Sequence, residues 1–436
     1  MKKYLKSKLI ALTLSLLTAI LLFSCGTKPE QAAQDEEVYD GKTITLNVYN
    51  WGEYISDGFE DTLDSNKAFE EYYFKKFGVR VKVNYTTYAT NEDMYSKLKS
   101  GAGSYDIVVP SDYMIQRMIN EDMLIEFDAQ ALENFKYLNP EYTGLYFDPD
   151  NRYSVAYTYG TVGIIYNCTM LRPEDLNEDG SLKNPSWSIM WDENYRGKIL
   201  QFNNPRDAFA TAMFLQGLDI NSTNTEDWVK AQQKLKEQKG IVQGYVNDEI
   251  FNKMTTGSAA ISAYYAGDYI TMASNNEYLR FAYPKEGTNV FVDAMCIPKS
   301  STHPEIAKEY INFMLSEEPA IANATYIGYA SPNSLVYNNA DYQDEMGEEA
   351  MEILYGMDAS ELNKNYAYSP YYRVFSDQMQ AYINGLWEGL KTASAIEPWI
   401  HVTSITIVVG VLGLASYSVY IKRKRSRFYR KRVTKK

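Results

Sequence analysis

The chain has 436 residues, of which 45% are hydrophobic and 23% charged, and its formal net charge is −13. Residues 1–25 contribute +4 and residues 422–436 contribute +10, so the part between these two ends carries −27. A central part this acidic disfavours nucleic acid as a partner, because phosphate binding needs basic patches, and it is compatible with a cationic ligand.

The N-terminal segment has the three parts of a secretory signal. Four lysines precede an apolar run from Leu9 to Phe23, and Ser24 and Cys25 follow directly. A cationic start, a short apolar core and small residues at the end are typical of a signal peptide; an uncleaved signal anchor is the alternative. The cysteine after Leu-Phe-Ser resembles a bacterial lipobox. We therefore predict a signal peptide over residues 1–25 with lipidation at Cys25, and a flexible tether over residues 26–42.

Strand and helix patterns alternate after the tether. Gly78 is a helix stop signal, Thr90 with the acids after it is a helix start signal, and Pro110 closes an apolar strand. The predicted strands cover residues 43–49, 79–85 and 106–109, and the predicted helices cover residues 65–76 and 90–98. This β-α-β-α-β order predicts a parallel sheet covered by helices.

Aromatic and polar side chains follow each of these strands. They are Trp51, Glu53 and Tyr54 after the first strand, Thr86, Thr87 and Tyr88 after the second, and Ser111, Asp112 and Tyr113 after the third. Ligands of α/β sheets bind beyond the carboxyl ends of the strands. We therefore expect these rings, hydroxyls and carboxylates to converge at one edge of the sheet and to form a binding site.

A second mixed α/β region follows. Its predicted strands cover residues 161–167, 197–202, 259–265 and 290–298, and its predicted helices cover residues 225–238 and 306–315. Strand-rich connections near residues 158 and 287 carry the chain from one lobe to the other and back. A chain that crosses in this way predicts two lobes that close on a ligand by hinge motion.

The C-terminal segment predicts a membrane anchor. Residues 400–421 are apolar and long enough to span a bilayer, and residues 422–436 hold ten Lys or Arg and no acid. By the positive-inside rule this tail is cytoplasmic and the acidic part lies outside. The alternative is a buried helix followed by a surface tail.

Motifs for catalysis or metal binding are absent from the sequence. The chain contains three cysteines and two histidines, too few for a metal cluster or a disulfide scaffold. Cys168 and Cys296 leave a disulfide open, although two buried thiols are favoured. Without a phosphate-binding loop or a nucleophile elbow, we predict no cofactor, no metal and no enzymatic activity.

Six stretches, in this order, resemble bacterial extracellular polyamine-binding proteins, the spermidine/putrescine receptors of ABC importers. They are residues 49–54 (YNWGEY), 91–98 (NEDMYSKL), 106–111 (DIVVPS), 195–199 (YRGKI), 283–287 (YPKEG) and 327–333 (IGYASPN). The resemblance extends from about Thr43 to Lys391. It implies the two-lobed type II fold of periplasmic binding proteins, with lobe 1 over residues 43–158 and 287–334 and lobe 2 over residues 159–286 and 335–391. It also implies a polyamine ligand and an ABC permease as partner.

The resemblance implies a set of ligand-binding residues. These are Trp51, Glu53, Tyr54, Ser111, Tyr113, Asp207, Tyr264, Phe291, Asp293 and Tyr329. A polyamine is an apolar chain with an ammonium at each end, so carboxylates are expected to hold its ends and rings to line its methylenes. Asn204 stands where a carboxylate is common and Gly52 where Thr or Ser is, which leaves the choice between putrescine and spermidine open. Arg373, Asp377 and Glu388 are further candidates for the cleft.

Three other functions remain open at this stage. A receptor of the same fold could bind another organic cation, or a metal through tyrosinates. An extracellular hydrolase could use Glu53 and Asp293 as paired acids. A sensor or adhesion protein is the third, although the short basic tail has no room for a signalling domain.

Overall fold

Strands and helices alternate at the start of the chain, as the sequence predicts. The computed structural model describes residues 41–59, 62–392 and Tyr417. Its first elements are β1 (Ile44–Trp51), α2 (Ser65–Phe77), β2 (Val81–Tyr88), α3 (Asn91–Lys99), β3 (Ile107–Val108) and α4 (Asp112–Asn120). Strand β1 pairs in parallel with both β2 and β3, so the predicted parallel sheet is confirmed.

The remaining elements follow the same mixed pattern. The strands are β4 (Ser154–Asn167), β5 (Ile199–Phe202), β6 (Val242–Val246), β7 (Ile261–Tyr265), β8 (Leu279–Ala282) and β9 (Val290–Cys296). The helices are α5 (Pro205–Gln216), α6 (Thr225–Lys239), α7 (Glu249–Thr255), α8 (Ala266–Ala273), α9 (Pro304–Met314), α10 (Glu317–Ile327), α11 (Ser334–Tyr337), α12 (Ala340–Tyr355), α13 (Ala359–Leu362) and α14 (Asp377–Thr392).

Local chemistry sets the ends of the first helices. Asp64 caps α2 by accepting a hydrogen bond from the Lys67 amide (2.9 Å), and Gly78 ends that helix in the left-handed region at φ 67°. Thr90 caps α3 by accepting from the Asp93 amide (3.1 Å). Side-chain acceptors at helix starts and a left-handed glycine at helix ends satisfy backbone groups that the helix leaves unpaired.

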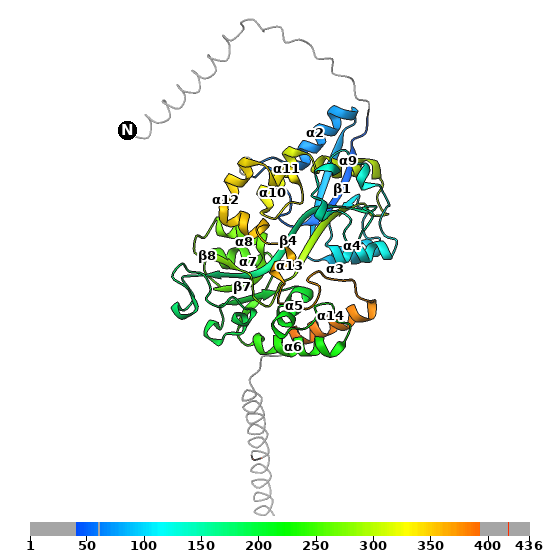
Figure 1. The fold of residues 1–436 in the computed structure, drawn as a ribbon. Coiled ribbons are helices and arrows are strands. Elements are labelled where there is room, and N and C mark those ends of the chain that lie inside the picture. Colours follow the sequence, from blue (N-terminus) through cyan, green and yellow to red (C-terminus); the bar gives the residue numbers. More distant parts are fainter. Residues whose placement is uncertain (1–40, 60–61, 393–416, 418–436) are drawn as a thin grey trace, which may run out of the picture. The chain divides into compact units, whose positions relative to one another are not determined.

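One long strand links the two halves of the sheet. The strand order is β2-β1-β3-β9-β4-β7-β5-β6, with β8 also paired to β4. The first part of β4, up to Thr161, pairs with β9, and the part from Val162 onward pairs with β7 and β8. In Figure 1, β4 runs from the region of β1, α9 and α4 to the region of β7 and α8. Strand β4 therefore belongs to both halves of the sheet.

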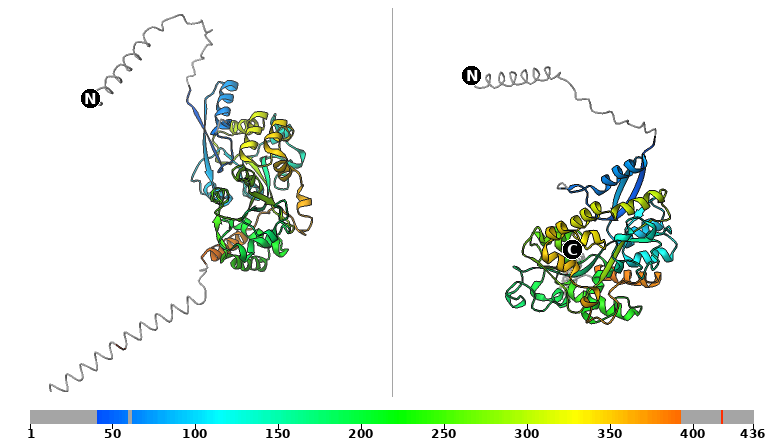
Figure 2. Two further views of the ribbon diagram at one scale, coloured as in Figure 1. Left: turned by 90° about the vertical axis from the view of Figure 1, so that its left-hand side faces the viewer. Right: turned by 45° about the horizontal axis from the view of Figure 1, so that its top comes forward.

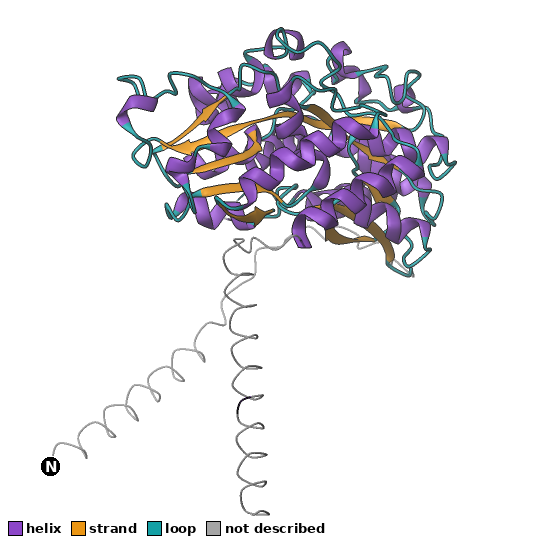
Figure 3. Cartoon of the chain, turned by 90° about the horizontal axis from the view of Figure 1, so that it is seen from below, coloured by secondary structure: helices purple, strands orange, loops and turns teal. Residues whose placement is uncertain are grey.

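Helices cover the sheet on its faces (Figure 3). Buried apolar residues of β1 and β3, among them Leu46, Val48 and Ile107, pack with Phe69 of α2. In both views of Figure 2 the orange α14 lies beside the green helices α5 and α6.

Some expectations need correction. Residues 86–88 lie within β2 instead of following it, so only Tyr88 stands at the strand's end. Cys168 and Cys296 are both free thiols, but Cys168 is partly exposed and only Cys296 is buried. Among the described residues no helix has the length and apolarity needed to cross a membrane. The predicted signal segment, Cys25 and the predicted span over residues 400–421, apart from Tyr417, lie outside the described residues.

Candidate ligand-binding site

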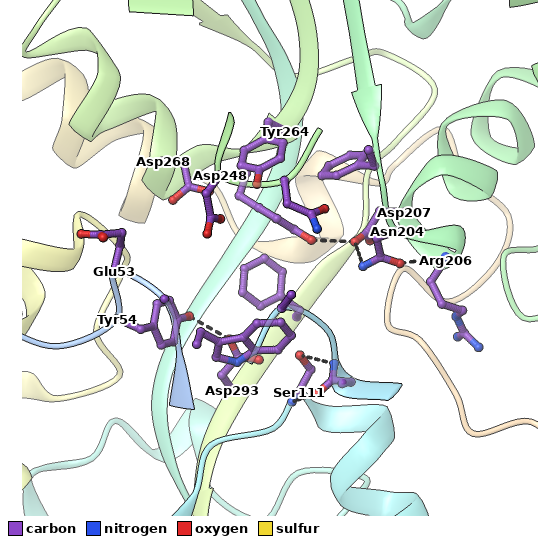
Figure 4. A pocket seen from close by; sticks show the side chains of 18 of the residues that line it. Glu53, Tyr54, Ser111, Asn204, Arg206, Asp207, Asp248, Tyr264, Asp268 and Asp293 are labelled. Atoms are coloured by element: carbon purple, nitrogen blue, oxygen red, sulfur yellow. Dashed lines mark hydrogen bonds between the residues drawn. The ribbon is translucent and has the colours of Figure 1, made fainter. Parts of the chain in front are cut away.

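A pocket forms where the carboxyl ends of β1, β2 and β3 face the second half of the sheet (Figure 4). All ten residues predicted for the site line it: Trp51, Glu53, Tyr54, Ser111, Tyr113, Asp207, Tyr264, Phe291, Asp293 and Tyr329. The space open to the centre of a water molecule is about 120 Å³, against the 10–15 Å³ or so that one water needs. The pocket therefore has room for a small organic molecule on the order of ten non-hydrogen atoms.

Asp293 presents a buried carboxylate to the pocket. It lies in β9 and is only 4% exposed. Its Oδ2 accepts a hydrogen bond from the Tyr54 hydroxyl (2.7 Å), which in turn shares one with Thr158 Oγ1 (2.6 Å). Its Oδ1 is buried and has no hydrogen-bond partner. Burial raises the pKa of Asp293 to about 6, while the Tyr54 hydroxyl and the neighbouring Ser111 side chain act in the opposite direction. A cationic donor in the pocket would satisfy this oxygen.

The turn after β1 supplies three of the predicted residues. Trp51, the last residue of β1, donates from Nε1 to the Val109 carbonyl (2.9 Å) and packs on Tyr88, with ring centroids 4.6 Å apart. Glu53 has a φ of 50°, a left-handed conformation that is uncommon outside glycine. The turn places Tyr54 against Asp293 and leaves the Glu53 carboxylate exposed at the pocket mouth.

Three carboxylates gather on one side of the pocket. Glu53, Asp248 and Asp268 come from the turn after β1, the residue before α7, and α8, and Figure 4 shows them grouped together. Desolvation raises the pKa of Asp268 to about 7; the Tyr329 hydroxyl lowers it, while Asp248 and Glu53 raise it further. No Lys or Arg forms an ion pair with these three acids among the ion pairs of the described chain. The group concentrates negative charge and would attract a cation.

Asp207 lies on the opposite side of the pocket and already accepts three hydrogen bonds from protein donors. Its Oδ2 accepts hydrogen bonds from the Tyr265 hydroxyl (2.6 Å) and Asn204 Nδ2 (2.7 Å), and its Oδ1 accepts one from the Tyr372 hydroxyl (2.8 Å). Burial raises its pKa, and the two tyrosine hydroxyls oppose this. Because three of about four acceptor positions are taken, Asp207 mainly fixes the tyrosines around it.

Arg206 does not pair directly with Asp207. Its side chain is 1% exposed and points away from the pocket centre in Figure 4. The guanidinium donates to the Arg373 carbonyl (3.2 Å) and lies over the rings of Tyr372 and Phe375, 4.4 and 4.3 Å from their centroids. The positive charge therefore stands behind the pocket wall.

Ser111 and Tyr113 at the start of α4 are held by Asn91. Asn91 Nδ2 donates to Ser111 Oγ (3.0 Å) and to the Tyr113 hydroxyl (3.2 Å), and the Tyr113 hydroxyl donates to Glu92 (3.1 Å). Ser111 also forms an isolated β-bridge with Asp293. These contacts fix one wall of the pocket close to the buried carboxylate.

Aromatic rings form the other walls. Phe291 packs between Tyr265 and Tyr329, with centroids 5.5 and 6.0 Å away, and Tyr264 stacks on Phe202 at 5.2 Å. Burial raises the pKa of the Tyr264 and Tyr329 hydroxyls well above the usual value. The rings stay neutral and offer flat faces to an apolar chain or a cation.

The structure adds lining residues that the sequence did not single out and removes three candidates. The additions with polar side chains are Asn91, Asn204, Arg206, Asn247, Asp248, Tyr265, Asp268, Asn289 and Tyr372. Arg373, Asp377 and Glu388 do not line this pocket. Asp268 lies in an apolar helix and Asp248 at the start of another helix. At both positions the sequence pattern indicates a helix and gives no sign of a binding site. Asn204 was noted only for its departure from the family pattern.

Comparison with known proteins identifies the family. The model of bacterial extracellular solute-binding proteins matches residues 67–348. The chain belongs to this family. Within it, this solute-binding protein is 32% identical over 290 residues to the spermidine/putrescine-binding periplasmic protein of Salmonella typhimurium, an alignment that covers 66% of this chain and 78% of that protein.

Solved structures share the fold of this solute-binding protein. A Listeria monocytogenes protein, provisionally assigned as a spermidine/putrescine ABC transporter, is 34% identical with a TM-score of 0.69, covering 81% of this chain and all of that chain. The spermidine/putrescine ABC transporter substrate-binding protein PotD of Streptococcus pneumoniae is 29% identical with a TM-score of 0.61, covering 80% of this chain and 99% of that chain. The predicted type II binding-protein fold is confirmed.

Proposed function

We propose that this solute-binding protein captures a polyamine of the putrescine or spermidine type and presents it to an ABC permease. Relatives that carry those ligands in their names support the proposal, as does a pocket that combines acids with neutral rings. The observation that carries it is Asp293 Oδ1, a buried carboxylate oxygen without a partner. Binding followed by release to a permease requires no catalytic step.

The chemistry of the pocket matches the chemistry of a polyamine. Each ammonium over a ring gains about 0.5–2 kcal/mol, which does not offset the several kcal/mol lost when an ammonium leaves water. Carboxylates must therefore hold the nitrogens. For a diamine, Asp293 takes one nitrogen, and the group of Glu53, Asp248 and Asp268 takes the other. Trp51 and Phe291 enclose the methylenes between them.

A metal held by tyrosinates fits this pocket less well. Burial raises the pKa of Tyr54, Tyr264 and Tyr329 well above the ordinary value of 10. Each of these hydroxyls would have to lose a proton in order to bind a metal, and burial makes that loss harder.

The lobe boundaries of the sequence analysis form part of the proposal. Lobe 1 comprises residues 43–158 and 287–334, and lobe 2 comprises residues 159–286 and 335–391. The long strand β4 and the segment between β8 and β9 are the two crossings that a hinge would use. A ligand that touches Asp293 and Asp268 contacts both lobes, so it stabilises the closed form by contacts that the open form lacks.

The membrane attachment is also proposed from the sequence. Lipidation at Cys25 and the span over residues 400–421 would hold the acidic part outside the membrane with residues 422–436 in the cytoplasm. A protease added to intact cells should remove the binding domain and leave a C-terminal epitope tag protected. Digestion of that tag in intact cells would refute the orientation.

Calorimetric titration of the full-length protein tests the ligand. Putrescine, spermidine and spermine are compared with butane-1,4-diol, which has the length of putrescine without its charges. We expect saturable binding of at least one amine and none of the diol. Absence of binding by every amine at millimolar concentration would refute the proposed function.

A further inference from the structure

Two buried acceptors without a hydrogen-bond partner line the pocket, and only one of them is an acid. Among the described residues, these are Asp293 Oδ1 and Asn289 Oδ1. Asn289 is only 3% exposed. A buried acceptor that is left without a hydrogen bond destabilises the protein. The shared environment indicates that both oxygens receive donors from the same ligand.

Asn289 and Asp293 project from one face of the same extended segment. The Asn289 carbonyl accepts a hydrogen bond from the Val162 amide (3.2 Å), which continues the pairing of β9 with β4 by one residue beyond Val290. Residues 289, 291 and 293 line the pocket, whereas residues 290 and 292 do not. This is the two-residue period of a strand, and it places the Phe291 ring between the two acceptors.

Neighbouring contacts hold Asn289 in place. The Thr288 amide donates to Asn363 Oδ1 (2.8 Å), and the Thr288 hydroxyl donates to the Val162 carbonyl. The Val290 amide donates to the Pro370 carbonyl (3.1 Å). Because the backbone is fixed on both sides of Asn289, its amide group has a defined position in the pocket.

The spacing of the two acceptors sets the length of ligand that reaches both. Four residues of extended chain separate them, or about 13 Å between Cα atoms. The nitrogens of putrescine are five single bonds apart, about 6 Å when extended, and the outer nitrogens of spermidine are nine bonds apart, about 11 Å. A hydrogen bond adds about 3 Å at each end, so an extended diamine joins acceptors up to about 12 Å apart and an extended triamine joins acceptors up to about 17 Å apart. A triamine can therefore lie along Phe291 and bond at both ends, whereas an extended diamine held at Asp293 falls short of Asn289.

We infer that Asn289 is a specificity-determining residue that binds the distal nitrogen of a triamine, an inference that rests on the proposed polyamine function. The nearby carboxylate of Asp207 is a poorer anchor for this nitrogen, since Tyr265, Tyr372 and Asn204 already donate to it. The amide oxygen of Asn289 accepts from an ammonium without adding a further buried charge to the unliganded pocket.

Two substitutions at one position test the inference. Asn289→Leu removes the acceptor at nearly constant size, and Asn289→Asp keeps an acceptor and adds charge. Calorimetry on full-length variants should show that Asn289→Leu weakens spermidine binding about ten-fold and changes putrescine binding less than two-fold. Asn289→Asp should bind spermidine at least as tightly as the wild type. The melting temperature without ligand is recorded for each variant, because a purely structural role would lower it and weaken both amines alike.

The outcomes separate this inference from the proposed function. If the wild type binds neither amine, the proposed function fails and the inference with it. If amines bind but Asn289→Leu leaves spermidine affinity unchanged, or weakens both amines equally, the inference is refuted and the function stands. If Asn289→Leu and Asn289→Asp both weaken spermidine alone, the amide donates to the ligand instead of accepting, and the inference is also refuted.

Discussion

Replacing Asp293 by Asn separates two consequences of burying a carboxylate, which are tighter binding of a cationic ligand and lower stability of the unliganded protein. The side chain keeps its shape, and because the Tyr54 hydroxyl can donate or accept with Thr158 (2.6 Å), it can accept a hydrogen bond from the new amide. Only the charge at the unpartnered Oδ1 is lost. A hydrogen bond to a charged group contributes about 1.5–3 kcal/mol. We therefore expect polyamine affinity to fall about ten- to hundred-fold.

The same substitution should stabilise the protein in the absence of ligand. Burial raises the pKa of Asp293 from 3.8 to about 6, so the ionised carboxylate opposes folding at every pH above about 6 and has no effect below about 4. Two pKa units correspond to about 3 kcal/mol, an upper value for the gain at neutral pH. Urea unfolding of the free variant at about pH 7.5 should show a higher midpoint.

The measurements pair calorimetry with urea unfolding on the full-length protein. Asp344→Asn, an exposed acid on α12, is the matched control for loss of one negative charge far from the pocket. It should change neither affinity nor stability by more than a small amount. An Asp293→Asn variant that binds as tightly as the wild type, or that unfolds more easily without ligand, would refute this account of the site.

Three further predictions follow from the same pocket. The pKa of Asp268 is raised to about 7 and that of Asp293 to about 6, so both acids bind protons and lose their charge between pH 8 and pH 5. Calorimetry over this range should show amine affinity falling at least about ten-fold. Constant affinity would contradict this prediction. Gly267→Ala places a Cβ 2.1 Å from Tyr329 Cδ2, so amine affinity and stability should both fall. In the control variant Gly385→Ala the new Cβ has nothing within 4 Å, and stability should rise by about 0.5–1 kcal/mol. Equal effects of the two substitutions on affinity and stability would refute the role of the Tyr329 position. Tyr54→Phe removes the hydroxyl shared by Asp293 and Thr158 and should lower the free energy of unfolding by about 1–3 kcal/mol; an unchanged urea midpoint would contradict it.

The sequence predicted the first half of the sheet because its signals are local. Alternating apolar residues, a capping Thr90 and a stop at Gly78 act within a few residues, and the structure has β1, α2, β2 and α3 within about two or three residues of the expected bounds. The residues after the strands were predictable for the same reason, since parallel strands deliver their carboxyl ends to one edge. The structure confirms that Trp51 and Ser111 share a pocket.

The length of β4 and the position of β9 depend on contacts far apart in the chain. The sequence predicted a strand-rich connection near residue 158 but began the strand itself only at residue 161, whereas residues 154–160 already pair with β9 more than 130 residues later. Strand β9 is antiparallel to its neighbours β3 and β4, a direction that no local pattern specifies. Pairing with distant segments therefore decided these elements.

By itself, the sequence determined the acidic charge, the order of the first elements and the chemistry at the ends of the strands, because each depends on composition or on near neighbours. Only the tertiary structure decided that Asp248 and Asp268 join Glu53, that Asp207 accepts hydrogen bonds from two tyrosines and Asn204, and that Asn289 faces the same pocket as Asp293. These facts depend on which side chains from distant segments meet in a desolvated space, and burial there sets both the pKa of each acid and the oxygens left for a ligand.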